Sequence, residues 1–354
     1  MRIIIEFMKL EIRILALLLC ATLASVACKK TVQPADEEIL NPVGFRAMSQ
    51  ATWVDPVPAT KADFPSTYDF GVWGIARHDQ ISSAYDLWGS TALTRASKNT
   101  VTQQYEPATA AYWLAGYKYT FLAIAPYTNS GVSNLTITPK VNQSAKDAIS
   151  FTFDMANKYT GADYDFDLLG ASAQTDQISG GHNASQDLTF WHLLSKISFE
   201  LKFGQDAKGQ QIDGTVNALS LSLKPEASYT ISHDDVSAQS TATLHVVANP
   251  TETSAVTVPL SITTNGAKFT AGPINIVPQT PADLTLTVDF EINESETSSV
   301  DYSLEINLAT SQVEKLLSNN RYNFRITIGA SAAITFDVTV NQEWTESDKE
   351  IDMN

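Results

Sequence analysis

Strict alternation of apolar and polar residues dominates the chain beyond residue 41. In the segment 197–203, Ile, Phe, Leu and Phe alternate with Ser, Glu and Lys. A period of two places one face of a strand in a core and the other in water, which is typical of antiparallel sheets. The sequence therefore predicts an all-β chain, with the same pattern at 68–72, 117–121, 149–153, 219–223, 284–290, 302–308 and 322–328.

Turn-forming residues suggest how the strands are grouped. Short strands separated by Gly, Pro and Asn indicate β-sandwiches, and a length of 354 residues favours two domains. The turn-rich run 173–185 is the predicted boundary, so we expect antiparallel β-sandwich domains at 42–178 and 186–354. One short helix is expected where Ser311 and Glu314 have the spacing of a capping box.

The first residues have the features of an export signal. Lys9 and Arg13 precede the apolar run 14–23, which is too short to span a bilayer comfortably. A basic start, a short apolar centre and small residues at its end are typical of a secretory signal peptide. Because the small residues lead directly into Cys28, we interpret 1–27 as a lipoprotein signal peptide.

Two alternatives remain open in this segment. Translation starts at Met1 or at Met8, since the residues from Met8 onward already form a complete signal. Cys28 is either acylated, which gives stable anchoring when more than one chain is attached, or an incidental residue after a plain cleaved signal. The polar residues 28–41 then form a tether. Cys20 leaves with the signal, so no disulfide is available to the mature chain.

The chain is strongly acidic, with a formal net charge of -16. Segment 1–27 holds three basic and two acidic residues, so its removal makes the charge one unit more negative. Phosphate backbones repel such a chain, and no basic cluster with interleaved aromatic residues offsets this. Nucleic acid is therefore excluded as the expected partner.

Catalytic motifs are not found in the sequence. The histidines lack metal-ligand spacing, and there is no phosphate-binding glycine loop, nucleophile elbow or dinucleotide fingerprint. Alternating carboxylates at Asp163, Asp165 and Asp167 suggest a hydrolase or a calcium site, but a strand with its polar face outward is the preferred interpretation. Trp113 and Trp191 suggest stacking on sugars, or packing within the fold. We expect no catalytic residue, metal or cofactor.

Several segments, in this order along the chain, resemble fimbrillin-like proteins. No single motif is specific, but the ordered set spans nearly the whole chain. The segments are YWLAGYKYTFLAIAP at 112–126, DLLGA at 167–171, LTFWHLLSKISF at 188–199, and NRYNFRI at 320–326 followed by ITFDV at 334–338 and Trp344.

This resemblance implies a fold, a location and a mode of assembly. Fimbrillins are stalk, tip or anchor subunits of surface pili, built from two transthyretin-like β-sandwiches and exported as lipoproteins to the outer membrane. A trypsin-like protease removes the first strand, and a strand of the next subunit fills the groove, which is β-augmentation between chains. The implied partners are other fimbrial subunits, the outer membrane through the lipid, and a receptor on a host or bacterial surface.

The sequence offers candidates for each part of this mechanism. The removable strand would present Val43, Phe45 and Ala47 on one face. Lys61 lies in a proline-rich stretch where regular pairing is disfavoured, and it is the first candidate for cleavage. Arg46, within the proposed strand, is the second candidate, and Arg95 is a third that is expected to lie too deep in the domain.

The last strand is the candidate donor. Its apolar face would consist of Ile334, Phe336, Val338 and Val340. A head-to-tail contact of this kind does not close and so grows a filament. The alternative is an ordinary last strand that stays in its own sheet.

The leading hypothesis is thus a structural or adhesive fimbrial subunit without enzymatic activity. One rival is an outer-membrane lipoprotein that binds glycans through Trp113 or Trp191. The other rival is a hydrolase built on the carboxylates of Asp163 to Asp167.

Overall fold

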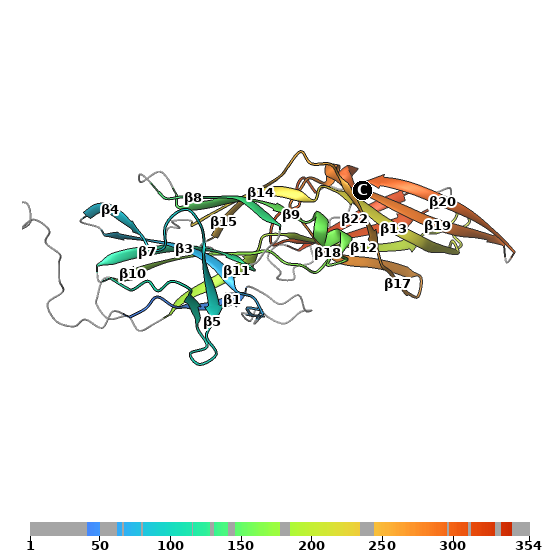
Figure 1. Ribbon diagram of the computed structural model, residues 1–354. Helices are drawn as coiled ribbons and strands as arrows, with labels where there is room; N and C mark the ends of the chain where they lie inside the picture. The colour runs from blue at the N-terminus through green and yellow to red at the C-terminus, as the bar shows by residue number, and fades with distance from the viewer. Residues whose placement is uncertain are drawn as a thin grey trace, which may run out of the picture. The chain divides into compact units, whose positions relative to one another are not determined.

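The computed structural model confirms the all-β prediction. Apart from the short helix α2 (Ala156–Thr160) and the 3₁₀ turns η1 (Pro281–Asp283) and η2 (Leu308–Thr310), the regular elements of its described residues are strands (Figure 1). It describes residues 41–49, 62–65, 67–78, 81–114, 116–127, 131–140, 146–177, 185–233, 244–295, 297–310, 313–329 and 334–341. The predicted signal peptide, the proposed acylation site Cys28 and the cleavage candidate Lys61 lie outside these residues.

Nine described strands form the first sheet, and their pairings close into a circuit. The order is β11-β10-β7-β3-β5-β6-β1-β2, with β4 attached to β3, and β1 pairs in addition with β11. The strands are β1 (Phe45–Ser49), β2 (Ala62–Asp63), β3 (Phe70–His78), β4 (Ile81–Asp86), β5 (Thr94–Lys98), β6 (Tyr105–Pro107), β7 (Tyr117–Ala125), β10 (Leu169–Gln177) and β11 (Gln186–His192).

The central strands of this sheet are buried on both faces. In β7, Phe121 faces a core inside the circuit and the next residue, Leu122, faces a second core outside it, and both are fully buried. In β3, Val72 faces the inner core and Trp73 faces the outer core. Alternation is therefore replaced by a continuous apolar run wherever a strand lies between two packed layers.

A second sheet covers the outer core. It has the order β15-β14-β9-β8 and consists of β8 (Val132–Thr138), β9 (Ala148–Asp154), β14 (Glu226–His233) and β15 (Leu244–Pro250). The rings of Phe151 on β9 and Tyr229 on β14 stack with centroids 5.2 Å apart. Strands from either side of the predicted domain boundary thus share a sheet, and the boundary itself stays a prediction.

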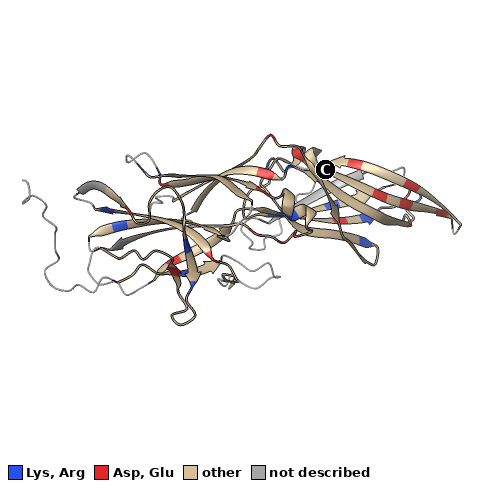
Figure 2. Cartoon of the chain, in the orientation of Figure 1, with Lys and Arg blue, Asp and Glu red and all other residues tan. Residues whose placement is uncertain are grey.

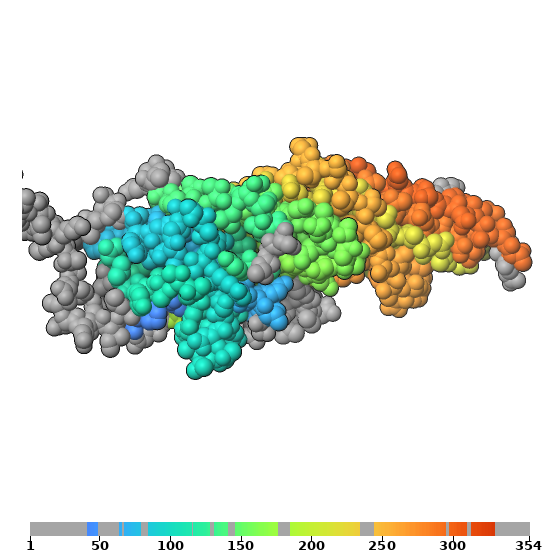
Figure 3. All heavy atoms as spheres, viewed as in Figure 1, coloured from blue at the N-terminus to red at the C-terminus, as the bar shows by residue number. Residues whose placement is uncertain are grey.

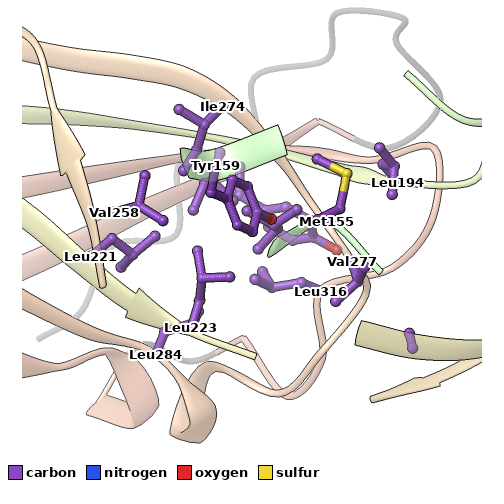
Figure 4. Packing of buried hydrophobic residues seen from close by; sticks show 14 of the residues in the cluster. Met155, Tyr159, Leu194, Leu221, Leu223, Val258, Ile274, Val277, Leu284 and Leu316 are labelled. Carbon is purple, nitrogen blue, oxygen red and sulfur yellow. The ribbon is translucent and has the colours of Figure 1, made fainter. Parts of the chain in front are cut away.

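Two further sheets share a core that is continuous with the outer core. One contains β16 (Val256–Leu260), β13 (Gly214–Leu223), β19 (Thr285–Ser295) and β20 (Ser298–Asn307), and the other contains β17 (Ile262–Asn265), β18 (Lys268–Ile276), β12 (Ser195–Phe203), β21 (Arg321–Ile328) and β22 (Ile334–Asn341), in these orders. Phe203 of β12 packs against Phe290 of β19 across the two sheets, with ring centroids 5.8 Å apart. Tyr159 of α2 and the N-cap residue Met155 add to this core, and Figure 4 shows Tyr159 near Leu221 and Leu223 of β13.

The outer face of the β13–β19–β20 sheet is acidic, and Figure 2 shows carboxylates spaced along β19 and β20. Glu291 of β19 lies directly opposite Asp301 of β20 in the register of the two strands. Like charges at opposite positions of an antiparallel pair repel each other. Part of the net charge of the chain is therefore concentrated on this face.

Two local predictions were wrong. The described residues around Leu316 form no helix, because the backbone N–H groups of Leu316 and Leu317 donate to Gln279 and to the Tyr322 hydroxyl instead. Residues 163–167 form no strand, with a turn at 164–165 and irregular backbone on either side of it. The cause is local, since the N–H of Asp163 donates to the carbonyl of Lys158 and closes the end of α2.

Candidate functional site

The strand β1 closes the first sheet. Residues 45–49 pair in parallel with 186–190 of β11, while Phe45 pairs with Tyr105 of β6 and residues 48–49 pair with β2. The backbone just before β1 is also held, since the N–H of Val43 donates to the carbonyl of Ala111 at 2.8 Å. Without β1, β11 and β6 would face each other across an open gap, each with an unpaired edge.

Phe45 is the centre of the contact between β1 and the inner core. Its side chain is fully buried. The ring lies edge to face with Phe121 at 5.1 Å and with Phe70 at 5.9 Å between centroids, and it lies 6.5 Å from Trp88. Val43 is buried in the same core, and Ala47 packs partly against it. The three residues predicted to share one face of the first strand therefore do so.

The surface beneath β1 is a layer of packed aromatic rings. Phe64 lies 4.6 Å from Phe190 and 5.6 Å from Tyr105, measured between centroids. Sequence reasoning did not identify Trp88 or Phe190 as part of this surface, because each comes from a strand or loop whose pattern says nothing about its partner. We call the surface formed by Phe64, Phe70, Trp88, Tyr105, Phe121 and Phe190 the β1 groove.

The outward side of β1 carries Arg46. Its Nε donates to Oδ1 of Asp187 at 2.7 Å, and the two residues are also directly paired in the β1–β11 ladder. The side chain is 61% exposed, but the peptide bond after it lies inside the paired strand. The third candidate, Arg95, lies in β5 and forms an ion pair with Asp69.

The segment after Lys61 also contacts β1. Ala62 and Asp63 form β2, which pairs antiparallel with Ser49 and Met48. A cut between Lys61 and Ala62 would therefore separate β1 from β2 covalently and leave only non-covalent contacts to hold β1. Whether a protease cuts after Lys61 or after Arg46 stays a prediction.

The candidate donor strand lies at the edge of its own sheet. β22 pairs antiparallel with β21 over eight residue pairs, from Arg321–Asn341 to Ile328–Ile334. Its other side has no strand partner among the described residues. The candidate donor residues Ile334, Phe336, Val338 and Val340 thus occupy alternate positions of this edge strand.

Between β9 and β10, two of the three carboxylates of the hydrolase hypothesis have separate partners. Asp163 pairs with Lys158 at 3.4 Å, while Oδ2 of Asp167 lies 2.5 Å from Nδ1 of the buried His192. Burial lowers the pKa of Lys196 to about 7, although the charges of Asp165 and Asp167 act against this shift. Among the described residues no group of His, Cys, Asp and Glu has the geometry of a metal site.

The two tryptophans of the glycan hypothesis differ in their surroundings. Trp113 is 7% exposed and packs edge to face on Tyr119 at 4.8 Å between centroids, so its ring offers no surface to a sugar. This half of the hypothesis is wrong. Trp191 is half-buried and lines a cavity of about 370 Å³.

The described helices include none with the length and apolar character needed to cross a membrane.

Comparisons with known proteins give one family and several related structures. The profile described as fimbrillin-like matches residues 59–344. A fimbrial protein from Bacteroides vulgatus has 17% identity and a TM-score of 0.49, covering 86% of this chain and 99% of its own. The fimbrial anchor protein Mfa2 from Porphyromonas gingivalis has 9% identity and a TM-score of 0.38, covering 85% and 97%.

A third structure has the same TM-score as the Bacteroides vulgatus protein. A putative cell adhesion protein from Bacteroides ovatus has 18% identity and a TM-score of 0.49, covering 87% of this chain and 99% of its own. No curated protein matches the chain in sequence.

Proposed function

Because the chain belongs to the fimbrillin-like family, we propose that it is a fimbrial subunit that loses β1 and assembles by donor-strand exchange. The family is structural and fimbrial, with a location at the cell surface. The finer proposal rests chiefly on one observation, the position of β1 as the closing strand of the first sheet. A subunit that lost this strand would expose the aromatic β1 groove, and a strand from another subunit would restore both the backbone pairing and the apolar contacts.

The proposed cleavage site is Lys61. A cut there releases the whole of β1, whereas a cut after Arg46 leaves Ala47 to Ser49 attached to the following chain and vacates only part of the groove. Arg46 is also paired in the ladder with Asp187, and a protease needs its substrate backbone unpaired. We therefore rank Lys61 first and keep Arg46 as the second candidate.

The proposed donor is β22. It is an edge strand with a single strand partner among the described residues, so its release breaks one ladder instead of two. Its alternate residues Ile334, Phe336, Val338 and Val340 would take the places of Val43, Phe45 and Ala47 in the groove of a neighbouring subunit. An anchor or tip subunit would use only one of these two features, either the donor strand β22 or the β1 groove.

The proposed membrane attachment is a lipid on Cys28, in a surface-exposed lipoprotein of the outer membrane. The support is the sequence of the first 28 residues, and the attachment applies to the form that keeps its N-terminus. Cleavage at Lys61 would release the subunit from the lipid at the same time as it frees β1. Anchoring and polymerisation would then be alternative fates of one precursor.

The first test is mass spectrometry of the N-terminus of the protein recovered from the cell surface. We expect the wild-type chain to begin at Ala62. We expect the Lys61→Gln variant to begin at acylated Cys28 and not to polymerise. The matched control is Arg46→Gln, which should mature normally. Fimbriae built from subunits that still begin at Cys28 would contradict the removal of β1.

A second test locks β22 in its own sheet. Asn323 and Thr339 are directly opposite in the β21–β22 ladder, and replacing both with Cys should allow a disulfide across this pair. The oxidised variant should fail to donate and should recover assembly after reduction. If oxidised and reduced forms assemble equally, β22 stays in its sheet and the donor role is wrong, while the removal of β1 is decided by the first test.

A further inference from the structure

The cavity beside Trp191 lies on the side of β11 away from the β1 groove. Phe190 is fully buried in the inner core, and the adjacent residue Trp191 points to the opposite face of the strand. The other walls are β15, which contributes Val246 and Val247, and the segment from Lys315 to Asn320. This cavity is therefore separate from the surface that assembly would use.

The segment that forms one wall is held rigidly in place. The hydroxyl of Ser318 donates to the carbonyl of Leu193 at 2.8 Å, and the N–H of Asn319 donates to Leu194 at 2.9 Å. Asn319 has a φ of 62°, a left-handed conformation that Asn tolerates better than most residues. These bonds fix the wall against the connection between β11 and β12, so the cavity is preformed.

A lysine is fixed at the wall of the same cavity. Nζ of Lys315 donates to the carbonyl of Ala248 at 2.9 Å and to Oδ1 of Asn249 at 3.4 Å. An ammonium has three donors, and the described residues accept two of them. The cavity lining contains Lys315 and no Asp or Glu, so it favours an anionic group over a cationic one.

The lining combines the indole of Trp191, the imidazole of His192, aliphatic side chains, a serine, amides and the ammonium of Lys315. At the rim, Val247 is 43% exposed and Leu317 is 45% exposed, so the cavity opens to solvent between apolar edges. Its volume of about 370 Å³ is at the small end of the range for ligand sites, which runs from about 300 to 1,000 Å³. A ligand of one ring fits this space better than an extended chain.

We propose that this cavity binds the terminal acidic sugar of a glycan, with the pyranose ring against Trp191 and the carboxylate directed to Lys315. One face of a pyranose ring is made of C–H groups and suits an indole, while its hydroxyl groups suit the polar wall of Ser318 to Asn320. A carboxylate completes the donor set of the ammonium through a charge-assisted hydrogen bond. The site goes beyond the proposed assembly function, because it needs neither the removal of β1 nor a second subunit.

The test is binding of methyl β-glucuronide to the full-length chain in detergent, measured by isothermal titration calorimetry, with methyl β-glucoside as the neutral match. We expect a dissociation constant on the order of 1 mM and about tenfold preference for the glucuronide, equivalent to one charge-assisted hydrogen bond. Equal binding of both sugars, binding of neither, or equal binding of acetate would overturn the proposal.

Variants assign the binding to the cavity. Trp191→Ala should reduce glucuronide affinity about tenfold or more, Trp191→Phe should retain most of it, and Lys315→Gln should abolish the preference over the glucoside. The matched controls are Tyr127→Ala, an aromatic residue with 40% exposure elsewhere, and Lys268→Gln, whose partner is Glu200. Unchanged affinity in Trp191→Ala, with the chain still folded by circular dichroism, would place any binding elsewhere.

Discussion

The ring of Phe45 meets the ring of Phe121 edge to face, with 5.1 Å between their centroids and 84° between their planes. One ring belongs to the strand proposed to leave, and the other belongs to a central strand that stays. Because both rings are fully buried, this contact contributes to the stability with which β1 is bound in the uncut protein.

Phe45→Ala should therefore destabilise the uncut protein by about 3–5 kcal/mol, the usual cost of truncating a buried Phe. Arg46→Ala, on the exposed face of the same strand, should cost less than about 1 kcal/mol. Urea unfolding of the two variants checks this difference. Equal losses would mean that β1 does not pack into the inner core as described.

Limited trypsin digestion should distinguish the two cleavage candidates in the uncut protein. The bond after Arg46 lies in a strand paired with β11, so it should be protected, and a fragment beginning at Ala62 should form before one beginning at Ala47. Edman sequencing or mass spectrometry of the early fragments provides the measurement. An early fragment that begins at Ala47 would show that β1 leaves its ladder readily without a cut at Lys61.

The ion pair between Arg77 and Asp147 joins the first sheet to the segment before β9. The two terminal guanidinium nitrogens of Arg77 donate to the carboxylate, at 2.7 and 2.6 Å, and the Asp147 side chain is only 5% exposed. Asp147→Asn should therefore cost about 1–3 kcal/mol of unfolding free energy. The more exposed pair of Arg95 and Asp69 is the control, and Asp69→Asn should cost less than about 1 kcal/mol.

The buried Lys196 should make stability depend on pH. Burial lowers its pKa to about 7 from 10.5, so between these values the unfolded chain binds a proton that the folded chain has released. The free energy of unfolding should then rise with pH from about 7 toward 10, by up to about 3 kcal/mol. Lys196→Met should flatten this rise, whereas Lys202→Met, at an exposed position of the same strand, should leave it intact.

Above pH 10 the trend should reverse. Burial raises the pKa of the buried tyrosines, so the folded chain retains protons that the unfolded chain loses, and stability falls with pH. The residues concerned are Tyr105, Tyr119, Tyr159, Tyr229, Tyr322 and the half-buried Tyr68. Thermal melts from pH 6 to pH 11 would record both limbs, and a flat profile between pH 7 and 10 would contradict the effect of Lys196.

The acidic pair Glu291 and Asp301 offers a stabilising substitution. The two residues are directly opposite in the β19–β20 ladder, so Asp301→Lys should replace a repulsion with an attraction and add about 0.5 kcal/mol. The gain should shrink in 1 M salt, where the Debye length is about 3 Å. Asp301 is exposed and Glu291 is partly exposed, and Figure 3 shows that the segment containing both lies on the surface of the molecule, so salt can screen this interaction.

The acidic segment 163–167 shows where sequence reasoning failed and why. Its alternation of Asp with Tyr and Phe matches a strand, but the turn that ends α2 and the contact of Asp167 with His192 set its conformation. His192 is 25 residues away in sequence, so no local pattern indicates the contact. The same limit applies to the expected helix near Leu316, whose backbone bonds go to Gln279 and Tyr322.

The sequence by itself determined the class of the protein. The alternation at 197–203 and 322–328 predicts strands with one buried face, and β12 and β21 have that pattern of burial. The ordered motifs led to the fimbrillin-like family. Both depend on local spacing, because side chains two residues apart share a face of a strand.

Only the tertiary structure decided which strands are neighbours. The pairing of Phe45 with Gln186 and Tyr105, which makes β1 the closing strand, joins segments that lie far apart in sequence. Burial of β3 and β7 on both faces likewise depends on the layers packed against them. Pairing across such separations is set by the total apolar area buried and the hydrogen bonds completed in the folded chain, and a local pattern contains neither quantity.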